Sequence, residues 1–364
     1  MKDVVQRAKE NNSEWKIMNF KAKQKQDYEF KKRYAQIRAW EFYNHSDING
    51  NCYVAVGGLD SITLLLFLRS IGIDVPAVSV SVLEDKSIQE VHKKLNVKSL
   101  MPLKSKVEVI REFGWPVLSK EIAGKISLLQ NPSPKNATVR HAIITGETGE
   151  YGGYRKNTRM KLSQKWLEKF GGYENEAESV AYQKPDFLVS DKCCYYLKEK
   201  PCNDYAKETG RFPYMGLMAS EGGRRQKALM INGCNYISPG TKRSCPFAIF
   251  SRQDLLQLAL DLDVPVPEIY GEIKRDKDGT LRTTKAQRTG CSMCGFGIHM
   301  EKRPNRFDFL WQRTPKEWEM WMHHVDQLPD GTWYGWGHVL DYIGVEWRDP
   351  QEQFWEQTFF REEE

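Results

Sequence analysis

The sequence has no run of about eighteen apolar residues, and this absence argues against a membrane-spanning helix. Its first residues, MKDVVQRAKENNSEWK, are polar and include acids, which is unlike a signal or transit peptide. It also has no internal repeat and no low-complexity tract. We therefore expect a cytoplasmic globular protein that has no membrane partner.

A strong excess of one charge is missing as well. The net charge of +6 is modest for 364 residues, so it allows an anionic partner without requiring one. Eight cysteines without an export signal do not suggest a disulfide framework, and clustered cysteines in a cytosolic chain indicate metal or redox chemistry. Seven of the eleven tryptophans follow residue 310, which predicts an aromatic-rich C-terminal part.

Short apolar runs alternate with helical patterns from residue 52 onward. CYVAV (52–56), VPAVSVSV (75–82) and VKSLMPL (97–103) are typical of strands, and each precedes a helical segment. Such alternation predicts an α/β fold with a doubly wound, mainly parallel sheet. We expect N-terminal helices before this sheet and a C-terminal helical, cysteine-containing extension after it.

The same patterns divide the chain into three expected segments. Residues 1–48 form the N-terminal helical segment, 49–270 the α/β domain, and 271–364 the C-terminal helical region with its cysteines. Residues 131–185 are rich in Asn, Pro, Gly and Tyr and have weak periodicity. We interpret them as an irregular insertion that faces a substrate.

The stretch VAVGGLDS places a glycine turn between a buried strand and a helix. Gly57 and Gly58 allow a sharp turn with exposed backbone N–H groups, and Leu59 follows at a variable position. Asp60 and Ser61 open the helix, where free N–H groups and the helix dipole favour an anion. This layout suits a pyrophosphate, but a tight turn without a ligand fits the local sequence equally well.

Two cysteine pairs indicate a metal site. Cys193 and Cys194 are adjacent at a predicted helix start, and Cys291 and Cys294 form a CxxC loop followed by glycines. Four thiolates suit an iron–sulfur cluster or zinc. Two further cysteines are alternative ligands: Cys234 and Cys245.

The order of these motifs resembles the phosphoadenosine phosphosulfate (PAPS) reductase family. The matching stretches, from about residue 30 to 347, are GGLDS, SKE, DKCCYYLKEKP, GLMASEGGRR and TGCSMCGFGIHMEKRPNRF. This family belongs to the PP-loop ATP-pyrophosphatase superfamily, and the likeness is greatest to its branch in bacteria and phages. The resemblance implies an adenine nucleotide α-hydrolase-like fold that binds ATP, adenylyl sulfate (APS) or PAPS. It also makes the four paired cysteines ligands of a [4Fe–4S] cluster, as in adenylyl-sulfate reductases.

The sequence departs from the family pattern at four places. The phosphate loop lacks the family's serine, either through a deletion or because Val56 replaces it. The turn after the second strand lacks its glycine and has Ser81 where an acid is usual. Met218 and Ala219 stand where sulfonucleotide reductases carry arginines, and no nucleophilic cysteine follows Cys294.

The missing C-terminal cysteine decides between the functions that the resemblance implies. Sulfite release through an enzyme thiosulfonate needs a thiolate that is not a cluster ligand, which leaves Cys202, Cys234 or Cys245. We therefore expect ATP-dependent adenylylation of an acceptor, with pyrophosphate release and iron–sulfur-dependent sulfur transfer. The acceptor is a nucleic acid or a protein, the electron or sulfur donor is external, and Mg²⁺ is a candidate companion of the phosphates. APS or PAPS reduction is the alternative, and a degenerate accessory protein that binds nucleotide or cluster is the second one.

Further residues complete the predicted site. We assign catalysis to Asp60, Ser61 and Arg225, and phosphate binding also to Lys120 and Arg224. The two arginines and Glu221 follow a strand of the parallel sheet, where ligands of open α/β folds lie, although a solvated face fits the arginines equally well. Lys120 and Glu121 either face the nucleotide or form a salt-bridged helix start.

Two groups near the C-terminus have competing interpretations. The basic segment after the CxxC loop either steers a polyanion or is ordinary charged surface; it contains His299, Lys302, Arg303 and Arg306. The tryptophans that follow are expected in the core of the C-terminal helices rather than stacked on bases; they are Trp318, Trp321, Trp333 and Trp336.

Overall fold

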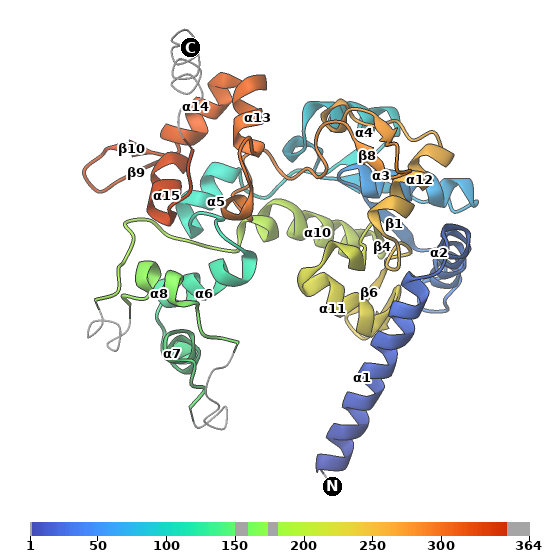
Figure 1. The fold of residues 1–364 in the computed structure, drawn as a ribbon, viewed down its shortest axis with the longest axis horizontal. Helices are drawn as coiled ribbons and strands as arrows, with labels where there is room; N and C mark the ends of the chain where they lie inside the picture. Colours follow the sequence, from blue (N-terminus) through green and yellow to red (C-terminus); the bar gives the residue numbers. More distant parts are fainter. Residues whose placement is uncertain (1, 150–158, 174–180, 348–364) are drawn as a thin grey trace. The chain divides into compact units, whose positions relative to one another are not determined.

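A computed structural model describes residues 2–149, 159–173 and 181–347, and these residues form two compact units (Figure 1). Unit 1 consists of Met1–Pro102 and Lys198–Cys291, and unit 2 of Leu103–Leu197 and Ser292–Glu364. The chain thus passes from unit 1 to unit 2, returns to unit 1 and ends in unit 2, whereas the sequence suggested three contiguous segments.

Unit 1 is built on a six-stranded sheet with the strand order β3-β2-β1-β4-β6-β5. All neighbours are parallel except β5, which pairs antiparallel with β6. The strands are β1 (Cys52–Ala55), β2 (Ala77–Ser79), β3 (Lys98–Ser99), β4 (Phe212–Met215), β5 (Asn235–Ser238) and β6 (Thr241–Ser244). The predicted α/β class with a mainly parallel sheet is confirmed.

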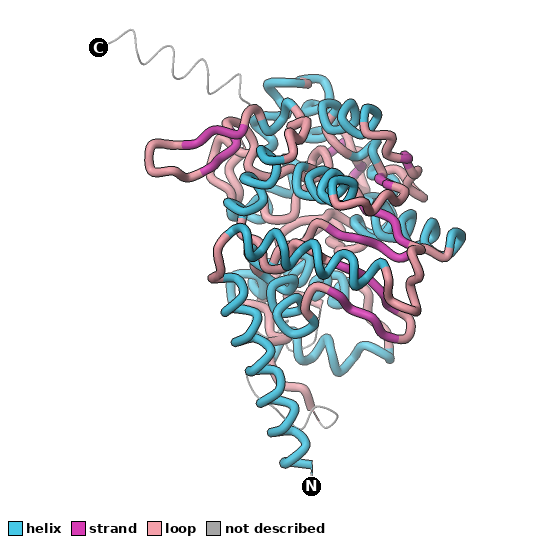
Figure 2. Tube along the Cα trace, turned by 90° about the vertical axis from the view of Figure 1, so that its right-hand side faces the viewer, coloured by secondary structure: helices cyan, strands magenta, loops and turns pink. Residues whose placement is uncertain are grey.

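Helices surround this sheet, and Figure 2 shows its strands running between them. They are α1 (Lys2–Gln24), α2 (Tyr28–Tyr43), α3 (Leu59–Ser70), α4 (Lys86–Lys94), α10 (Lys200–Thr209), α11 (Gly223–Asn232) and α12 (Arg252–Asp261). Short 3-10 turns cover Ser81–Leu83, Ala219–Glu221 and Glu268–Tyr270, and a hairpin is formed by β7 (Ile273–Arg275) and β8 (Leu281–Thr283). A π-helical segment, Tyr195–Glu199, precedes α10.

Alternate residues of β1 show that both faces of the sheet are covered. Cys52 and Val54 belong to the main apolar core of unit 1. Tyr53, between them, belongs instead to a small cluster with Tyr205 of α10, and the two rings meet edge to face at 5.3 Å. Because successive strand side chains point to opposite faces, the nearly continuous apolar run at 52–56 follows from this double burial.

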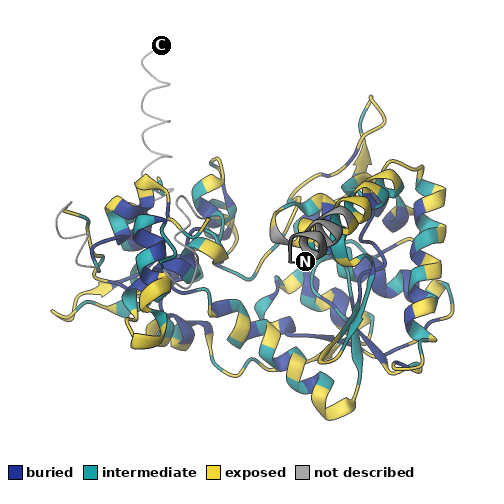
Figure 3. Ribbon diagram, turned by 90° about the horizontal axis from the view of Figure 1, so that it is seen from below, coloured by how far each residue is buried: buried dark blue, intermediate teal, exposed yellow. Residues whose placement is uncertain are grey.

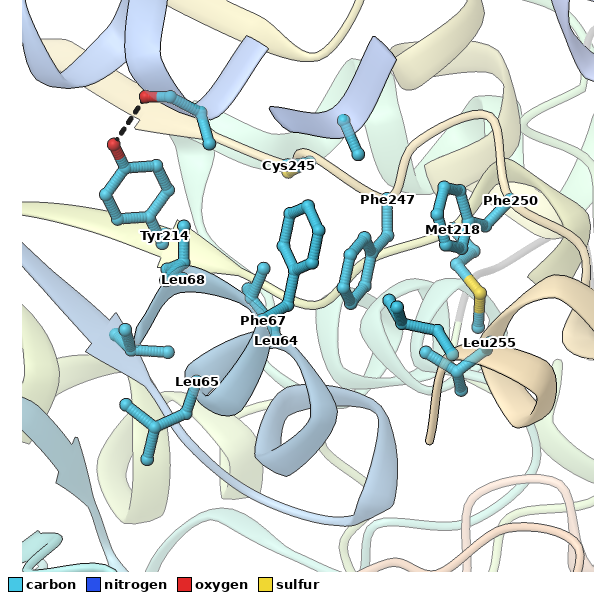
Figure 4. Packing of buried hydrophobic residues seen from close by; sticks show 14 of the residues in the cluster. Leu64, Leu65, Phe67, Leu68, Tyr214, Met218, Cys245, Phe247, Phe250 and Leu255 are labelled. Carbon is cyan, nitrogen blue, oxygen red and sulfur yellow. Dashed lines mark hydrogen bonds between the residues drawn. The ribbon is translucent and has the colours of Figure 1, made fainter. Parts of the chain in front are cut away.

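The main core of unit 1 lies between the sheet and helices α2, α3 and α12. Figure 4 shows Phe67 of α3 packed against Phe247, which in turn stacks on Phe250 with ring centroids 4.7 Å apart. The buried hydroxyl of Tyr214 in β4 donates a hydrogen bond to the carbonyl oxygen of Ala39 in α2, 2.7 Å away. Helix α12 begins with a capping box, in which Ser251 and Asp254 bond each other's backbone N–H groups.

Unit 2 is mainly helical and contains a short hairpin. Its helices are α5 (Lys106–Phe113), α6 (Lys120–Gln130), α7 (Ala137–Thr145), α8 (Gln164–Phe170), α13 (Arg306–Arg313), α14 (Pro315–His323) and α15 (Trp336–Ile343). The hairpin pairs β9 (Asp326–Gln327) with β10 (Trp333–Tyr334), and 3-10 turns cover Pro134–Asn136 and Ile298–Met300. The segment expected to be an irregular insertion therefore contains α7 and α8, while its residues 150–158 and 174–180 lie outside the described ones.

Aromatic side chains dominate the core of unit 2. Trp115 and Trp336 meet edge to face at 4.8 Å, and neither is exposed beyond 1 %. Trp318 and Trp321 are also buried, as predicted, but Trp333 is 48 % exposed because it lies on the β10 hairpin. Figure 3 shows this buried interior beneath exposed helix faces. Among the described residues, no helix is long and apolar enough to cross a membrane.

Candidate phosphate-binding site

The predicted glycine loop lies at the carboxyl edge of the sheet, where the connections of two neighbouring strands diverge. From β1 the chain continues through α3 to β2, on one side of β1. From β4, the other neighbour of β1, it continues through α11 toward β6 and β5. Such a switch point leaves a crevice at the strand ends, which is where ligands of open α/β sheets bind.

Val56 extends the strand into the loop. Its N–H donates to the carbonyl oxygen of Val78 at 2.8 Å, so the ladder between β1 and β2 continues through this position. The Val56 side chain is buried in the apolar core. Val56 therefore occupies the position before the two glycines and contributes no polar group to the loop.

The hydroxyl of Ser61 holds the loop together from the first turn of α3. It accepts the N–H of Gly57 at 2.7 Å and donates to the carbonyl oxygen of Gly58 at 3.0 Å. The expected role of Ser61 as a hydroxyl donor to an anion thus competes with bonds inside the loop. A ligand that takes this hydroxyl must replace the bond to Gly58.

The connection after β4 approaches the loop closely. A Cβ atom at Gly216 would lie 3.0 Å from the carbonyl oxygen of Asp60 and from the Cα of Ser61. This spacing is tighter than ordinary van der Waals contact, so only glycine fits here without displacing the start of α3. The ends of β1 and β4 are consequently packed against each other at the switch point.

Asp60 lies among charged groups of both signs. Its carboxylate pairs with the guanidinium of Arg252, the first residue of α12. Burial raises the pKa of the Asp60 carboxyl and the nearby Glu221 raises it further, while Arg252 and Arg288 oppose them. Two arginines therefore place positive charge next to the helix start, as a phosphate site requires.

The arginines predicted as phosphate ligands lie on α11, and their contacts do not involve the glycine loop in the described side chains. Arg225 is largely exposed and pairs with Glu221 at 3.0 Å, one turn away. The side chain of Arg224 lies outside what the structure describes. Met218 and Ala219, in the positions where reductases carry arginines, are buried in the apolar core.

A polar network borders the loop from the side of β2. His92 of α4 contacts the carbonyl oxygen of Gly57 through Nε2 at 2.8 Å, and its Nδ1 lies 3.0 Å from the Ser81 hydroxyl. Because a carbonyl can only accept, Nε2 carries the proton and Nδ1 accepts from Ser81 in the neutral ring. Burial lowers the pKa of His92, although the bond to Gly57 opposes this.

Glu84 brings a buried carboxylate to the same network. A Cβ at Gly57 would lie 3.7 Å from its Oε1, and the same oxygen pairs with Lys198 Nζ at 2.6 Å. Burial alone would lower the pKa of Lys198, but the charges of Cys291 and Glu84 raise it above its usual range. Glu84, rather than Ser81, is therefore the acid near the end of the second strand.

Lys120 and Glu121 belong to unit 2, whereas the loop belongs to unit 1. They open α6, whose N-cap Ser119 accepts the N–H of Ile122 at 3.1 Å. Glu121 also pairs with Lys125 at 3.2 Å. These contacts account for the salt-bridged helix start, and the assignment of Lys120 to the nucleotide stays a prediction.

The four paired cysteines are divided between the units. Cys193, Cys194 and Cys294 belong to unit 2, and Cys291 ends unit 1. Within the described part of the chain, no three His, Cys, Asp or Glu side chains are grouped as metal ligands. The four-thiolate ligand set therefore stays a prediction from the sequence.

The cysteines named as substitutes lie inside unit 1. Cys234 and Cys245 are buried neighbours, because the N–H of Cys245 donates to the carbonyl oxygen of Cys234 at 2.7 Å. Burial raises the pKa of each thiol to about 12. Burial also raises the pKa of Cys202. A raised pKa disfavours the thiolate that would attack a sulfonucleotide.

Half of the basic segment after the CxxC loop is engaged in local pairs. Arg303 pairs with Asp308 at 2.6 Å, and Arg306 pairs with Glu301. Arg306 also donates to the carbonyl oxygen of Cys294 at 3.1 Å. These arginines support the fold around the CxxC loop, which favours the interpretation as ordinary charged surface.

Sequence reasoning missed several residues of this site. Glu84 and His92 follow the second strand, so the rule that parallel strands end at one edge was enough to find them. Arg252 directly follows Ser251, the N-cap of α12, and is identifiable from that position. Tyr270 and Thr289 also reach the loop, because the Tyr270 hydroxyl accepts the N–H of Leu59 at 3.1 Å and lies 2.6 Å from the Thr289 hydroxyl. They lie far along the chain in an irregular region, and no local pattern marks them.

Comparisons with known proteins give limited information. No protein-family profile matches the chain, and no curated protein does. Among solved structures, the chain is similar to a crystal structure of phosphoadenylyl-sulfate (PAPS) reductase from Candida auris in complex with phosphate. The sequence identity is 11 %, the TM-score is 0.33, and the match covers 68 % of this chain and 89 % of that one. A likeness this distant establishes neither a family nor an activity.

Proposed function

We propose that unit 1 binds the phosphate chain of an adenine nucleotide, ATP, at residues 57–61, as a PP-loop enzyme of the PAPS reductase type. The observation that carries this proposal is the glycine loop at the switch point. Gly216 packs closely against the start of α3, and Arg252 lies beside the loop through its pair with Asp60. Backbone N–H groups at a helix start and a nearby guanidinium are what a pyrophosphate needs. The motif order of the chain supports the choice of an adenine nucleotide.

The proposed reaction has two steps. An acceptor oxygen attacks the α-phosphorus of ATP, so that a new O–P bond forms and the bond to pyrophosphate breaks. A sulfur nucleophile from an external donor then displaces AMP from the adenylylated acceptor, which is a nucleic acid or a protein. The loop and Arg252 hold the leaving pyrophosphate, because its negative charge increases as the bond breaks. Mg²⁺ beside the phosphates is part of the same proposal.

The cofactor part of the proposal is a [4Fe–4S] cluster, or zinc in its place, on Cys193, Cys194, Cys291 and Cys294. It is supported by the two thiol pairs in the sequence and carries no step of the reaction above. Anaerobically purified protein is expected to be brown, and Cys291→Ser to lose the colour, with Cys202→Ser as the matched control. Colourless protein that contains zinc would exclude the cluster.

A specific observation favours a second candidate function, a nucleotide-free accessory protein. The Ser61 hydroxyl and the N–H of Leu59 are both bonded within the protein. Sulfonucleotide reduction has less support, because burial raises the pKa of the Cys202, Cys234 and Cys245 thiols and so disfavours the attacking thiolate.

Calorimetry on the anaerobic full-length protein tests the proposal with Ser61→Ala and Ser70→Ala as a matched pair. Both serines lie on α3 and bond a backbone carbonyl of the same helix region, but Ser70 is exposed, ends the helix and bonds Phe67. We expect Ser61→Ala to weaken ATP binding about tenfold and Ser70→Ala to leave it unchanged. Absence of binding of ATP, APS and PAPS to the wild type would leave only the accessory function. Sulfite release from APS or PAPS with a thiol donor would restore the reductase.

A further inference from the structure

We propose that residues 268–289, here called the strap, close the phosphate loop when no nucleotide is bound. The Tyr270 hydroxyl then occupies the position of a phosphate oxygen. This inference rests on the proposed function and adds a built-in control of the same site. The strap contains the turn Glu268–Tyr270 and the hairpin of β7 and β8, and it belongs wholly to unit 1.

The first contact is made at the helix start itself. The backbone N–H of Leu59, the first residue of α3, donates to the Tyr270 hydroxyl at 3.1 Å. The first N–H groups of a helix have no partner within the helix and attract anions. The Thr289 hydroxyl lies 2.6 Å from the same oxygen, and Tyr270 is only 3 % exposed. The Tyr270 hydroxyl, held by Thr289, therefore engages the Leu59 N–H, the donor that a bound phosphate would use.

The space above the second glycine is filled by the same pair. A Cβ atom at Gly58 would overlap the Tyr270 hydroxyl and would lie 3.0 Å from the Thr289 Oγ1. Gly58 thus admits the two hydroxyl groups as closely as it would admit a phosphate oxygen. Both cannot occupy this space, so a bound phosphate and the closed strap exclude each other.

The second contact also uses a group of the phosphate site. The guanidinium of Arg252 pairs with Asp60 and donates through Nη2 to the carbonyl oxygen of Gln287 in the strap, at 3.0 Å. A phosphate that bonds Arg252 removes this tie. Ligand binding and release of the strap are therefore linked through Leu59 and Arg252.

The strap is held to α12 through strand β8 of its hairpin. Leu281 is buried, and its N–H and carbonyl groups bond the Gln253 side chain at 2.7 and 2.8 Å. The outer arm, residues 284–289, is mainly exposed. It bonds Arg252 through the Gln287 carbonyl and the Tyr270 hydroxyl through Thr289, so opening the arm breaks the bond to Arg252 and leaves Tyr270 without its partner Thr289.

The test compares Tyr270→Phe with Tyr28→Phe in the full-length protein. Tyr28 loses a hydroxyl bond of 2.6 Å to Asp261 in the same unit, away from the loop, and is therefore a matched control. Because Tyr270→Phe removes the competitor for the Leu59 N–H, we expect inorganic pyrophosphate and ATP to bind about tenfold more tightly. Tyr28→Phe should bind like the wild type. Unchanged or weaker binding by Tyr270→Phe would overturn the proposal, since the hydroxyl would then be neutral or a ligand donor.

A measurement without any ligand separates this inference from the proposed function. We expect faster backbone hydrogen exchange at Leu59 in Tyr270→Phe and in Thr289→Val, and unchanged exchange in Tyr28→Phe. Unchanged exchange in the first two variants would overturn the strap. Faster exchange, together with absence of nucleotide and pyrophosphate binding in every variant, would retain the strap contact and overturn the proposed function.

Discussion

The two units bury their cores in different ways. Unit 1 covers both faces of a parallel sheet with aliphatic and aromatic side chains, and its polar groups gather at one edge around residues 57–61. Unit 2 packs helices around tryptophans and has a two-stranded hairpin as its sheet in the described residues. In unit 1, the edge of the sheet positions the residues of the candidate site. In unit 2, a few large aromatic rings provide much of the buried core and hence of the stability.

The largest effect is expected from Trp336→Ala in unit 2. Trp336 is fully buried against Trp115 and Phe307, and its removal should lower the free energy of unfolding by about 3–5 kcal/mol. Hydrogen exchange resolved by segment should then rise in unit 2 and stay unchanged in unit 1. The matched control is Trp333→Ala, because that ring is half exposed. Equal losses in the two variants would contradict a core built on particular rings.

Lys31→Met should have the next largest effect, and in the other unit. Lys31 and Asp254 form an ion pair at 2.8 Å with both side chains buried, so removing the lysine leaves a buried carboxylate without its counter-ion. We expect a loss of about 3 kcal/mol in chemical denaturation, with increased exchange confined to unit 1. Lys32→Met is the control, since its pair with Asp261 is more exposed. A spread of the effect into unit 2 would show that the units are not independent.

The smallest effect is a pH dependence of unit 1 that comes from His92. Burial lowers its pKa below the ordinary 6.5, so the unfolded chain binds the proton more readily than the folded one. Stability is therefore highest above pH 6.5 and is lost as the pH falls toward the folded-state pKa. Denaturation at several pH values should show this loss in the wild type and a flatter profile in His92→Gln. Stability that increases toward acid pH would mean that the charge of Glu84 raises the pKa of His92 more than burial lowers it.

Local patterns predicted the parts of unit 1 that depend on local chemistry. The strand at 52–56, the glycine loop and the cap of α12 follow from burial on two faces, backbone freedom and side-chain capping. The hairpin of β5 and β6 was missed although Pro239 and Gly240 form a two-residue turn between its strands. Tyr270 and its partner Leu59 are 211 residues apart in the sequence. A local sequence pattern cannot reveal a contact between residues that are so far apart.

The cysteine pattern illustrates the opposite case. Spacing indicates which thiols are chemically suited to one metal, but the fold decides where each segment lies. Here the division of the chain assigns Cys291 to one unit and Cys194 to the other. Residues 57–61 need only one strand and one helix to form their turn, whereas the placement of four thiols depends on segments that are far apart in the chain.

The outermost strand β3 has a further consequence. It contains only Lys98 and Ser99, and both are exposed at the open edge of the sheet. A long apolar edge would offer unpaired N–H and C=O groups to another polypeptide, whereas a two-residue edge that includes a lysine offers almost none. The β3 edge of this sheet should therefore resist the edge-to-edge pairing that leads to aggregation, even at high concentration.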